Sequence, residues 1–120
     1  MLSLPPSVRI FVARGATDLR RSFDRLAAQV QEVLRQDPFS GHVFAFCNRR
    51  RDRLKLLVWD RGGFWLLYKR LEGGTFAALE RDELTPRELF LLLEGIDVVH
   101  ERVRYQRPPA ADQSKGRHGT

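Results

Sequence analysis

The sequence predicts an α+β domain, a mainly antiparallel sheet of four to six strands with two helices packed on it. Several short segments alternate apolar and polar residues as strands do, and two longer segments place apolar residues at helical spacing. Most strand signals form a run between the two helix signals, which is typical of α+β proteins. The length of 120 residues suits a single domain.

The N-terminal elements are a strand and an amphipathic helix. Residues 8–12 alternate and carry β-branched side chains, which predicts a strand. Arg14-Gly15-Ala16 should turn the chain, and Thr17 is placed to cap the helix that follows. We expect this helix to end before Asp37-Pro38, because proline disfavours helical geometry in the residue before it. Its apolar stripe, over about five turns, consists of Leu19, Phe23, Leu26, Ala27, Val30, Val33 and Leu34.

The central elements are strands joined by short connections. The segments predicted as strands are 42–47, 53–60 and 64–71. Residues 48–52, between the first two, form a polar loop rich in arginine. Arg61-Gly62-Gly63 joins the last two strands tightly, so these strands should form a hairpin. Residues 75–77 are a candidate for a short fifth strand.

The C-terminal third holds the second helix. Thr85-Pro86-Arg87-Glu88 is a capping box with proline at the first helical position. The helix should run through Glu94, and Gly95 is a good terminator. Residues 96–105 are a candidate strand that would complete a domain of residues 1–105. From Gln106 the chain has no large apolar side chain to bury, which predicts a disordered polar tail over 106–120.

Composition excludes several classes of protein. The longest apolar run, Leu89–Leu93, is far shorter than the roughly 20 residues of a membrane helix. No secretory signal develops at the N-terminus, and the single Cys47 can form neither an internal disulfide nor a zinc site of the usual spacing. The expectation is a small, basic, cytoplasmic protein without a metal or other cofactor.

The positive charge is concentrated in one segment. The chain has 21 Lys+Arg against 15 Asp+Glu, a formal net charge of +6. Residues 47–70 alone carry eight cations and two anions, so this segment accounts for the whole excess. The cations are Arg49, Arg50, Arg51, Arg53, Lys55, Arg61, Lys69 and Arg70. Such clustering favours an anionic partner.

Strand alternation sorts the predicted hairpin into two faces, because directly opposed residues share a face. With a two-residue turn around Gly62, one face carries Arg53, Lys55, Leu57, Trp59, Phe64, Leu66, Tyr68 and Arg70. The other face carries Leu54, Leu56, Val58, Trp65, Leu67 and Lys69 and is the better core. Cations and aromatics together on the first face suit phosphate contacts and packing on bases or sugars. The alternative is that the arginines are solvated and the aromatics cover a satellite core.

Arg20 and Arg21 give a second indication of an anion. Both fall in the first turn of the predicted helix, where a cation opposes the helix macrodipole at a cost of up to about 1 kcal/mol. An anion bound at the same backbone N–H groups would explain them. A local ion pair with Asp18 or Asp24 is the competing explanation.

Catalytic arrangements are absent from the sequence pattern. The three histidines are scattered, no Ser/His/Asp or Cys/His set is indicated, and Cys47 reads as a small core residue. A two-metal nuclease would need carboxylates converging from several elements, which no motif indicates. We therefore expect a protein that is not an enzyme.

Taken in order, these motifs resemble one family. The segments that carry the resemblance are TDLRRSFDRL at 17–26, DPFSGHVFAF at 37–46, NRRRDRLK at 48–55, WD at 59–60, GF at 63–64, YKRLE at 68–72 and LLEGID at 92–97. They are similar to the TnpB accessory proteins, the second open reading frame of the insertion-sequence sixty-six group. The resemblance implies a bacterial accessory protein of DNA transposition, encoded beside a larger transposase, and brings no catalytic residues with it.

Two functions are compatible with these observations. The first is DNA binding at the element ends, with phosphate contacts from the basic hairpin (Arg49, Arg50, Arg51, Arg53, Lys55, Lys69 and Arg70) and from Arg20 and Arg21. Trp59, Phe64 and Tyr68 would pack on sugars or unstacked bases. The second is an adaptor that uses the aromatic face or a strand edge to hold the transposase or another accessory protein. A magnesium-dependent nuclease ranks well below both.

Overall fold

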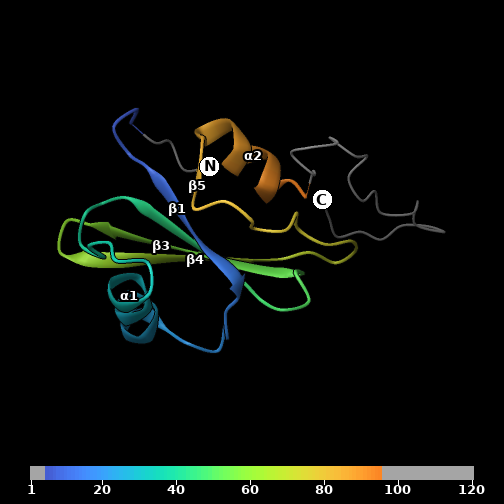
Figure 1. Ribbon diagram of the computed structural model, residues 1–120, viewed down its shortest axis with the longest axis horizontal. Coiled ribbons are helices and arrows are strands. Elements are labelled where there is room, and N and C mark those ends of the chain that lie inside the picture. The colour runs from blue at the N-terminus through green and yellow to red at the C-terminus, as the bar shows by residue number, and fades with distance from the viewer. Residues whose placement is uncertain (1–4, 96–120) are drawn as a thin grey trace.

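The protein is an α+β domain built on one five-stranded sheet, as the sequence predicts (Figure 1). The computed structural model describes residues 5–95, and the candidate strand 96–105 and the tail 106–120 lie outside them. The elements are β1 (Ile10–Ala16), α1 (Phe23–Glu32), β2 (Val43–Cys47), β3 (Arg53–Asp60), β4 (Gly63–Arg70), β5 (Glu83–Leu84) and α2 (Pro86–Leu93). The strand order is β4-β3-β2-β1-β5. Only the β1–β2 pair is parallel, so the described sheet is mainly antiparallel.

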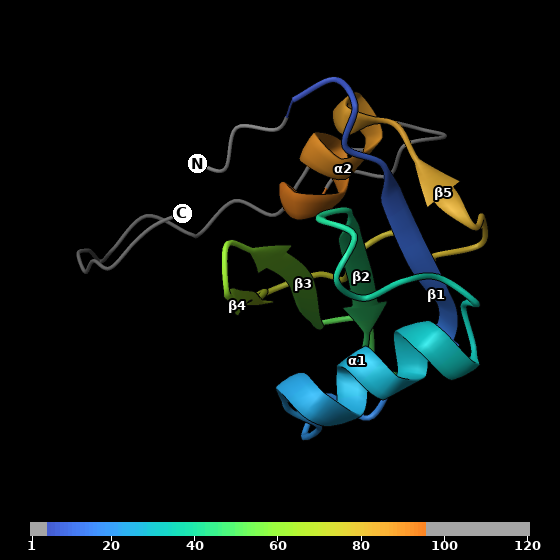
Figure 2. The same ribbon diagram turned by 90° about the vertical axis from the view of Figure 1, so that its left-hand side faces the viewer.

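The two helices cover opposite faces of the sheet (Figure 2). On the α1 side, Leu26 and Val30 of the helix pack with residues such as Phe44 and Leu57 of the sheet. The α2 side holds a second core, formed by Ile10, Val12, Val43, Ala45, Cys47, Leu54, Leu56, Phe76, Leu79, Leu89 and Leu92. Both faces of the central strands are therefore buried. The prediction of a single core face for the hairpin was wrong in two respects. Helix α1 covers part of the face that carries the cations, and Trp65 and Leu67 on the predicted core face are exposed.

The start of the chain differs from the prediction. Arg14-Gly15-Ala16 does not turn the chain but continues β1 through a register shift, with Gly15 at φ 81° and Ala16 paired to Cys47. Thr17 is buried, and its N–H donates to the Cys47 carbonyl at 2.8 Å. Thr17 is therefore hydrogen-bonded to the sheet and does not cap the helix as predicted. Helix α1 begins six residues later, at Phe23.

Helix α1 is also shorter than predicted at its other end. It ends at Glu32, and its C-cap Val33 is 66% exposed. Leu26 and Val30 hold the predicted apolar stripe in the core, whereas Phe23 and Val33 lie outside it. Arg35, three residues after the end of the helix, takes the left-handed conformation at φ 57°, which a continuing helix could not contain.

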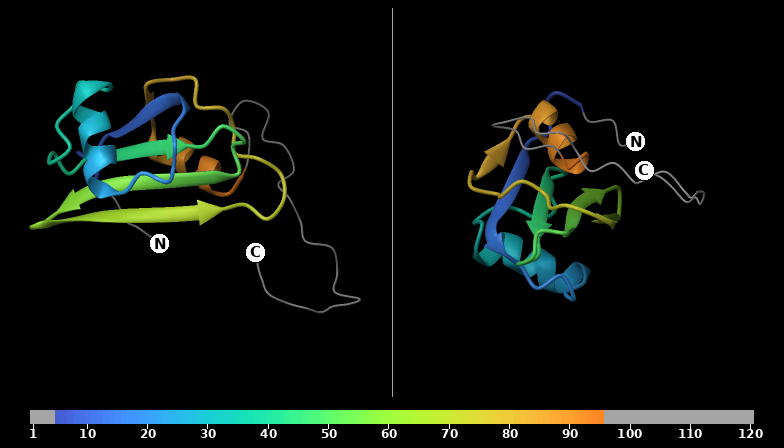
Figure 3. Two further views of the ribbon diagram at one scale, coloured as in Figure 1. Left: turned by 90° about the horizontal axis from the view of Figure 1, so that it is seen from below. Right: turned by 90° about the vertical axis from the view of Figure 1, so that its right-hand side faces the viewer.

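The β3–β4 hairpin confirms the predicted register and face assignment. Eight consecutive cross-strand pairs run from Arg53↔Arg70 to Asp60↔Gly63 without a bulge. Arg61 and Gly62 form the two-residue turn, and both have positive φ, 45° and 87°. This combination is typical of the type I′ turn, whose twist matches that of the strands. The hairpin tip projects at one end of the sheet (Figure 3).

The second half of the fold contains one wrong prediction and one confirmed prediction. Residues 75–77 form no strand, and Phe76 is instead fully buried as part of the α2-side core. The fifth strand is instead the short β5, where Glu83 makes a bidentate ion pair with Arg9 beside β1. The capping box of Thr85 and Glu88 is present at the start of α2, as predicted.

The hairpin turn generates a stability prediction. Arg61 is in the left-handed conformation, which costs a non-glycine residue about 1–2 kcal/mol and which asparagine tolerates better. Arg61→Asn should therefore raise the free energy of unfolding in urea by about 0.5–1 kcal/mol. Arg61→Ala removes the same charge but keeps the unfavourable φ, so it should give no such increase. Equal shifts from both variants would contradict this account of the turn.

Candidate nucleic-acid interface

The arginine-rich loop between β2 and β3 is rigidly built. The Asn48 side chain closes it, donating to the Asp52 carboxylate at 2.7 Å and accepting from the N–H groups of Asp52 and Arg53 at 3.1 and 3.0 Å. The hydrogen bond from Asn48 lowers the pKa of the Asp52 carboxyl. The sequence pattern singled out the arginines and missed Asn48, although asparagine is a common turn-forming residue that bonds its own backbone neighbours.

The loop is also fastened to the segment after β4. The Leu71 N–H donates to the Asp52 carbonyl at 2.8 Å, and the Phe76 N–H donates to the Arg51 carbonyl at 2.6 Å. Arg51 has φ 58°, and its guanidinium donates back to the Phe76 carbonyl at 3.2 Å. The loop therefore lies against neighbouring chain rather than standing out from the sheet.

A pocket of about 530 Å³ brings two predicted basic segments together. One wall comes from the chain that leaves β1, and the other from the arginine loop and the start of the hairpin. Its lining residues are Ala16, Thr17, Asp18, Leu19, Arg20, Asn48, Arg49, Arg50, Arg53 and Tyr68. Four of the nine predicted cations, and one of the three predicted aromatics, thus share one concavity. We call it the arginine pocket.

The arginine pocket has unbalanced charge. Four arginines line it against one carboxylate, that of Asp18. Within residues 5–95, the side chains of Arg49 and Arg50 make no hydrogen bond or ion pair. Arg53 lies directly opposite Arg70 in the hairpin, and like charges in this position destabilise a sheet. A bound anion would reduce the electrostatic repulsion among these arginines.

Arg20 is held by Asp18, the ion pair that competed with anion binding as its explanation. The guanidinium makes two short contacts with the carboxylate, at 2.9 and 3.0 Å. These bonds lower the pKa of Asp18 to about 2. The helix-dipole argument for Arg20 and Arg21 was wrong, because α1 starts at Phe23 and both residues precede it. Arg20 nevertheless reaches the pocket, whereas Arg21 turns to Gln29 and does not line it.

Lys55 was wrongly placed among the phosphate contacts. It is only 8% exposed, and its Nζ donates to the backbone carbonyls of Leu19 at 2.6 Å and Arg21 at 3.1 Å. The ammonium also lies 4.9 Å from the centre of the Tyr68 ring. Lys55 therefore stabilises the arginine pocket, because its two hydrogen bonds hold the segment around Arg20 against the sheet.

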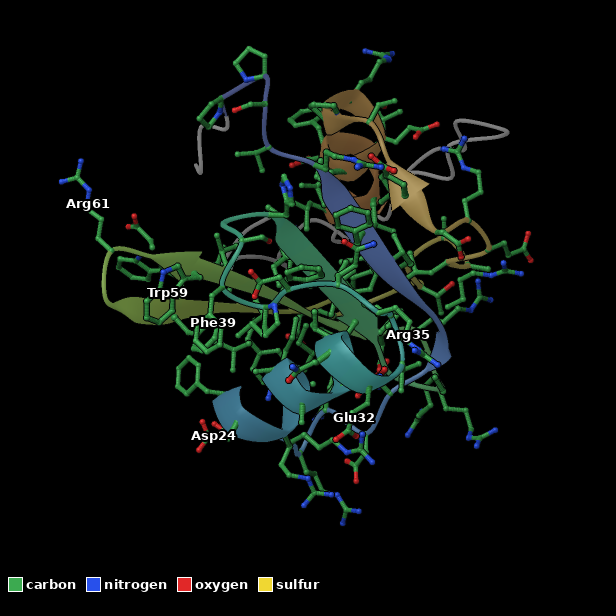
Figure 4. The ribbon with its side chains drawn as sticks, turned by 60° about the vertical axis from the view of Figure 1, so that its left-hand side comes forward. Asp24, Glu32, Arg35, Phe39, Trp59 and Arg61 are labelled. Atoms are coloured by element: carbon green, nitrogen blue, oxygen red, sulfur yellow. The ribbon has the colours of Figure 1, made fainter. Side chains whose placement is uncertain are left out.

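Trp59 and Phe64 lie away from the arginines, at the tip end of the hairpin. Trp59 lies six residue steps along β3 from Arg53, a distance of roughly 20 Å. Phe39, from the loop before β2, lies beside Trp59 (Figure 4), with ring centroids 5.0 Å apart. Its ring also packs on Phe64, at a centroid distance of 5.4 Å. The three rings form an aromatic cluster, and the sequence pattern gave no sign of Phe39 as its third member.

The remaining predicted residues are dispersed. Lys69 lies on the α2 side of the hairpin, where its Nζ donates to the Leu93 carbonyl at 2.6 Å. Arg70 is on the pocket side and pairs with Glu72. Arg51 is engaged with Phe76, as described above, and does not line the pocket. Of the predicted set, Arg20, Arg49, Arg50, Arg53 and Tyr68 line the arginine pocket.

Other site chemistry finds little support in the described part of the chain. Residues 5–95 contain no cluster of three or more His, Cys, Asp or Glu side chains that could hold a metal ion. Burial raises the pKa of the Cys47 thiol to about 11, which leaves little thiolate at neutral pH. Within the same residues, no helix has the length and apolar character needed to cross a membrane.

The fold and the pocket define a small α+β protein with one basic, concave surface. The model of the family described as IS66 Orf2 like protein (TnpB_IS66) matches residues 8–103, and the chain belongs to this family. The family connects the chain with transposition by an insertion sequence. The resemblance drawn from the sequence motifs is thereby confirmed.

Two relatives from Sinorhizobium fredii (strain NBRC 101917 / NGR234) cover most of the chain. The uncharacterized protein y4hO is 38% identical over 104 residues, which span 83% of this chain and 90% of the relative. The uncharacterized protein y4jC is 36% identical over 122 residues, which span 96% of this chain and 98% of the relative. No solved structure matches the chain significantly.

Lys55 generates a prediction about stability. Lys55→Met keeps the length of the side chain but leaves one buried and one half-buried carbonyl without their donor, which should lower the free energy of unfolding in urea by about 1–3 kcal/mol. Arg25→Met is the matched control, because Arg25 is exposed on α1, and it should change stability by less than about 0.5 kcal/mol. If the two variants lose equal stability, Lys55 does not fasten the segment around Arg20.

Asp18 generates a prediction about pH. Because its folded pKa lies below the usual value near 3.9, its pairing with Arg20 stabilises the fold fully above about pH 4, and this contribution is lost as the pH falls towards 2. Carboxyl ¹³C NMR should show Asp18 titrating at about 2, and Arg20→Met should return the midpoint towards 4. Arg21→Met should move it much less. An unchanged midpoint in Arg20→Met would show that another group lowers this pKa.

Proposed function

We propose that the protein is a non-catalytic accessory factor of transposition that binds the DNA of its element through the arginine pocket. The observation that carries this proposal is the convergence of Arg20, Arg49, Arg50 and Arg53 on one concavity. Arginine suits this task, because its planar fork of donors matches phosphate oxygens. The role would operate in the bacterial cytoplasm, at the nucleoid and beside the transposase.

The build of the pocket supports binding without reorganisation. The Asn48 hydrogen bonds fix the loop that carries Arg49 and Arg50, and Asp18 fixes the guanidinium of Arg20. A site whose cations are already in place loses less conformational entropy when it binds. Arg49 and Arg50, whose side chains make no hydrogen bond or ion pair within residues 5–95, then supply the new phosphate contacts.

A second candidate function is an adaptor that holds the transposase or another accessory protein. The observation that favours it is β4, which lies at one edge of the sheet formed by residues 5–95. Trp65 on this strand is 59% exposed, Leu67 is also exposed, and the pairing with β3 has no bulge that would protect the edge. Regular edge strands with exposed apolar side chains are places where another chain can add a strand.

Removing two arginines tests DNA binding directly. Arg49→Ala/Arg50→Ala should weaken binding to element-end DNA by about 10- to 100-fold at 0.1 M salt. The variant makes fewer phosphate contacts, so its binding releases fewer counterions from the DNA. The slope of log K against log salt should fall in magnitude by about 1.4–1.8. Fluorescence anisotropy over a salt series measures both quantities.

A matched pair of cations controls for net charge. Arg25→Ala/Arg61→Asn also removes two exposed arginines, one on α1 and one at the hairpin tip, neither of which lines the pocket. This control should leave the salt slope unchanged, and equal losses from both pairs would contradict a localised site.

Capture of the transposase from cells that express the whole element separates the two candidate functions. Capture that nuclease abolishes supports DNA binding, and capture that survives nuclease supports the adaptor.

A further inference from the structure

The shape of the arginine pocket constrains the form of DNA that it accepts. The volume of about 530 Å³ lies within the range of pockets that hold small ligands, about 300–1,000 Å³. Proteins read duplex DNA with helices or ribbons that enter a groove, which requires an element that stands out from the surface. The arginine loop is fastened to Leu71 and Phe76 and does not stand out. The element that does project is the hairpin tip, whose turn residues Arg61 and Gly62 supply a single cation, Arg61 (Figure 4).

The lining combines the two components that an unpaired nucleotide requires. Arg49, Arg50 and Arg53 provide charge for the phosphate, and Tyr68 provides the one aromatic ring of the pocket. Tyr68 is 54% exposed, so its ring is available to a base. Proteins that bind single strands commonly combine a basic groove with aromatic rings on which bases stack.

The Tyr68 ring is held in place before any ligand arrives. The Lys55 ammonium lies 4.9 Å from the ring centre, and the Arg53 guanidinium lies 3.4 Å from the phenol oxygen. Tyr68 and Lys55 are directly opposed in the hairpin, so the sheet itself sets their separation. An exposed aromatic that served only to cover the core would not need supports on both its ring and its hydroxyl.

From these contacts we infer that the arginine pocket binds an unpaired nucleotide of single-stranded DNA, with its phosphate on the arginines and its base stacked on Tyr68. This inference rests on the proposed DNA-binding function and narrows it to one form of the nucleic acid. Stacking is tolerant of sequence, since every base has a π face, so the pocket should recognise an unpaired strand rather than a particular base.

The test compares three labelled probes on the full chain by fluorescence anisotropy: dT₁₂, the dT₁₂·dA₁₂ duplex, and a 12-nucleotide strand of abasic sites with the same phosphates. The protein should bind dT₁₂ at least tenfold more tightly than either the duplex or the abasic strand. An rU₁₂ probe compares an RNA strand with the DNA strand, and it should bind no more tightly than dT₁₂. Equal binding of dT₁₂ and the abasic strand would overturn the inference.

Three variants locate the stacking ring. Tyr68→Leu should weaken dT₁₂ binding by about 5- to 150-fold and leave abasic binding unchanged, the effect expected for losing one base stack. Tyr68→Phe keeps the ring and should stay within about twofold of the original chain. Trp65→Leu removes the exposed aromatic on the other face of the same strand and should have no effect. Equal losses from Tyr68→Leu and Trp65→Leu would overturn the assignment to Tyr68.

The outcomes separate this inference from the function on which it rests. If every probe binds equally well and Arg49→Ala/Arg50→Ala weakens them all, the protein binds DNA but not through an unpaired nucleotide, and only the inference fails. If no probe binds at low salt, the proposed function fails with it.

Discussion

A buried ammonium joins the sheet to the chain that leads into α1, and the arrangement of the basic residues depends on it. Lys55 donates to the carbonyls of Leu19 and Arg21, the two residues that flank Arg20. Burying a charge in a protein core is costly unless polar partners surround it. The two carbonyls and the Tyr68 ring are such partners, so one lysine fixes the position of Arg20 on one wall of the pocket and of Tyr68 on the other.

The pocket is thus a product of long-range contacts between local structures that are each simple. A tight asparagine-closed loop presents Arg49 and Arg50, and a regular hairpin presents Arg53. The bulged end of β1 lets Thr17 pair with β2, which carries the following residues past that loop. None of these segments forms a concavity alone, and Lys55 holds them in one.

Local patterns predicted most of the fold, and the errors share one cause. The hairpin and the capping box of α2 follow from turn glycines, strand alternation and a Thr-Pro-x-Glu motif, all of which act over a few residues. Thr17 was misassigned because a sheet partner 30 residues away took its N–H. The same limit applies to the site. Alternation placed Lys55 and Arg53 on one face correctly, but only the packing of the segment before α1 buries the first and leaves the second exposed.

Eight unbroken cross-strand pairs make the β3–β4 hairpin stiff and hold its two ends roughly 20 Å apart. The aromatic cluster of Phe39, Trp59 and Phe64 sits at one end, and the arginine pocket at the other. Groups separated by more than about 7–10 Å, with no shared partners, contribute additively to stability and binding. Substitutions at the tip should therefore add to, rather than alter, the effects of substitutions in the pocket, so the two ends of this one hairpin can diverge independently.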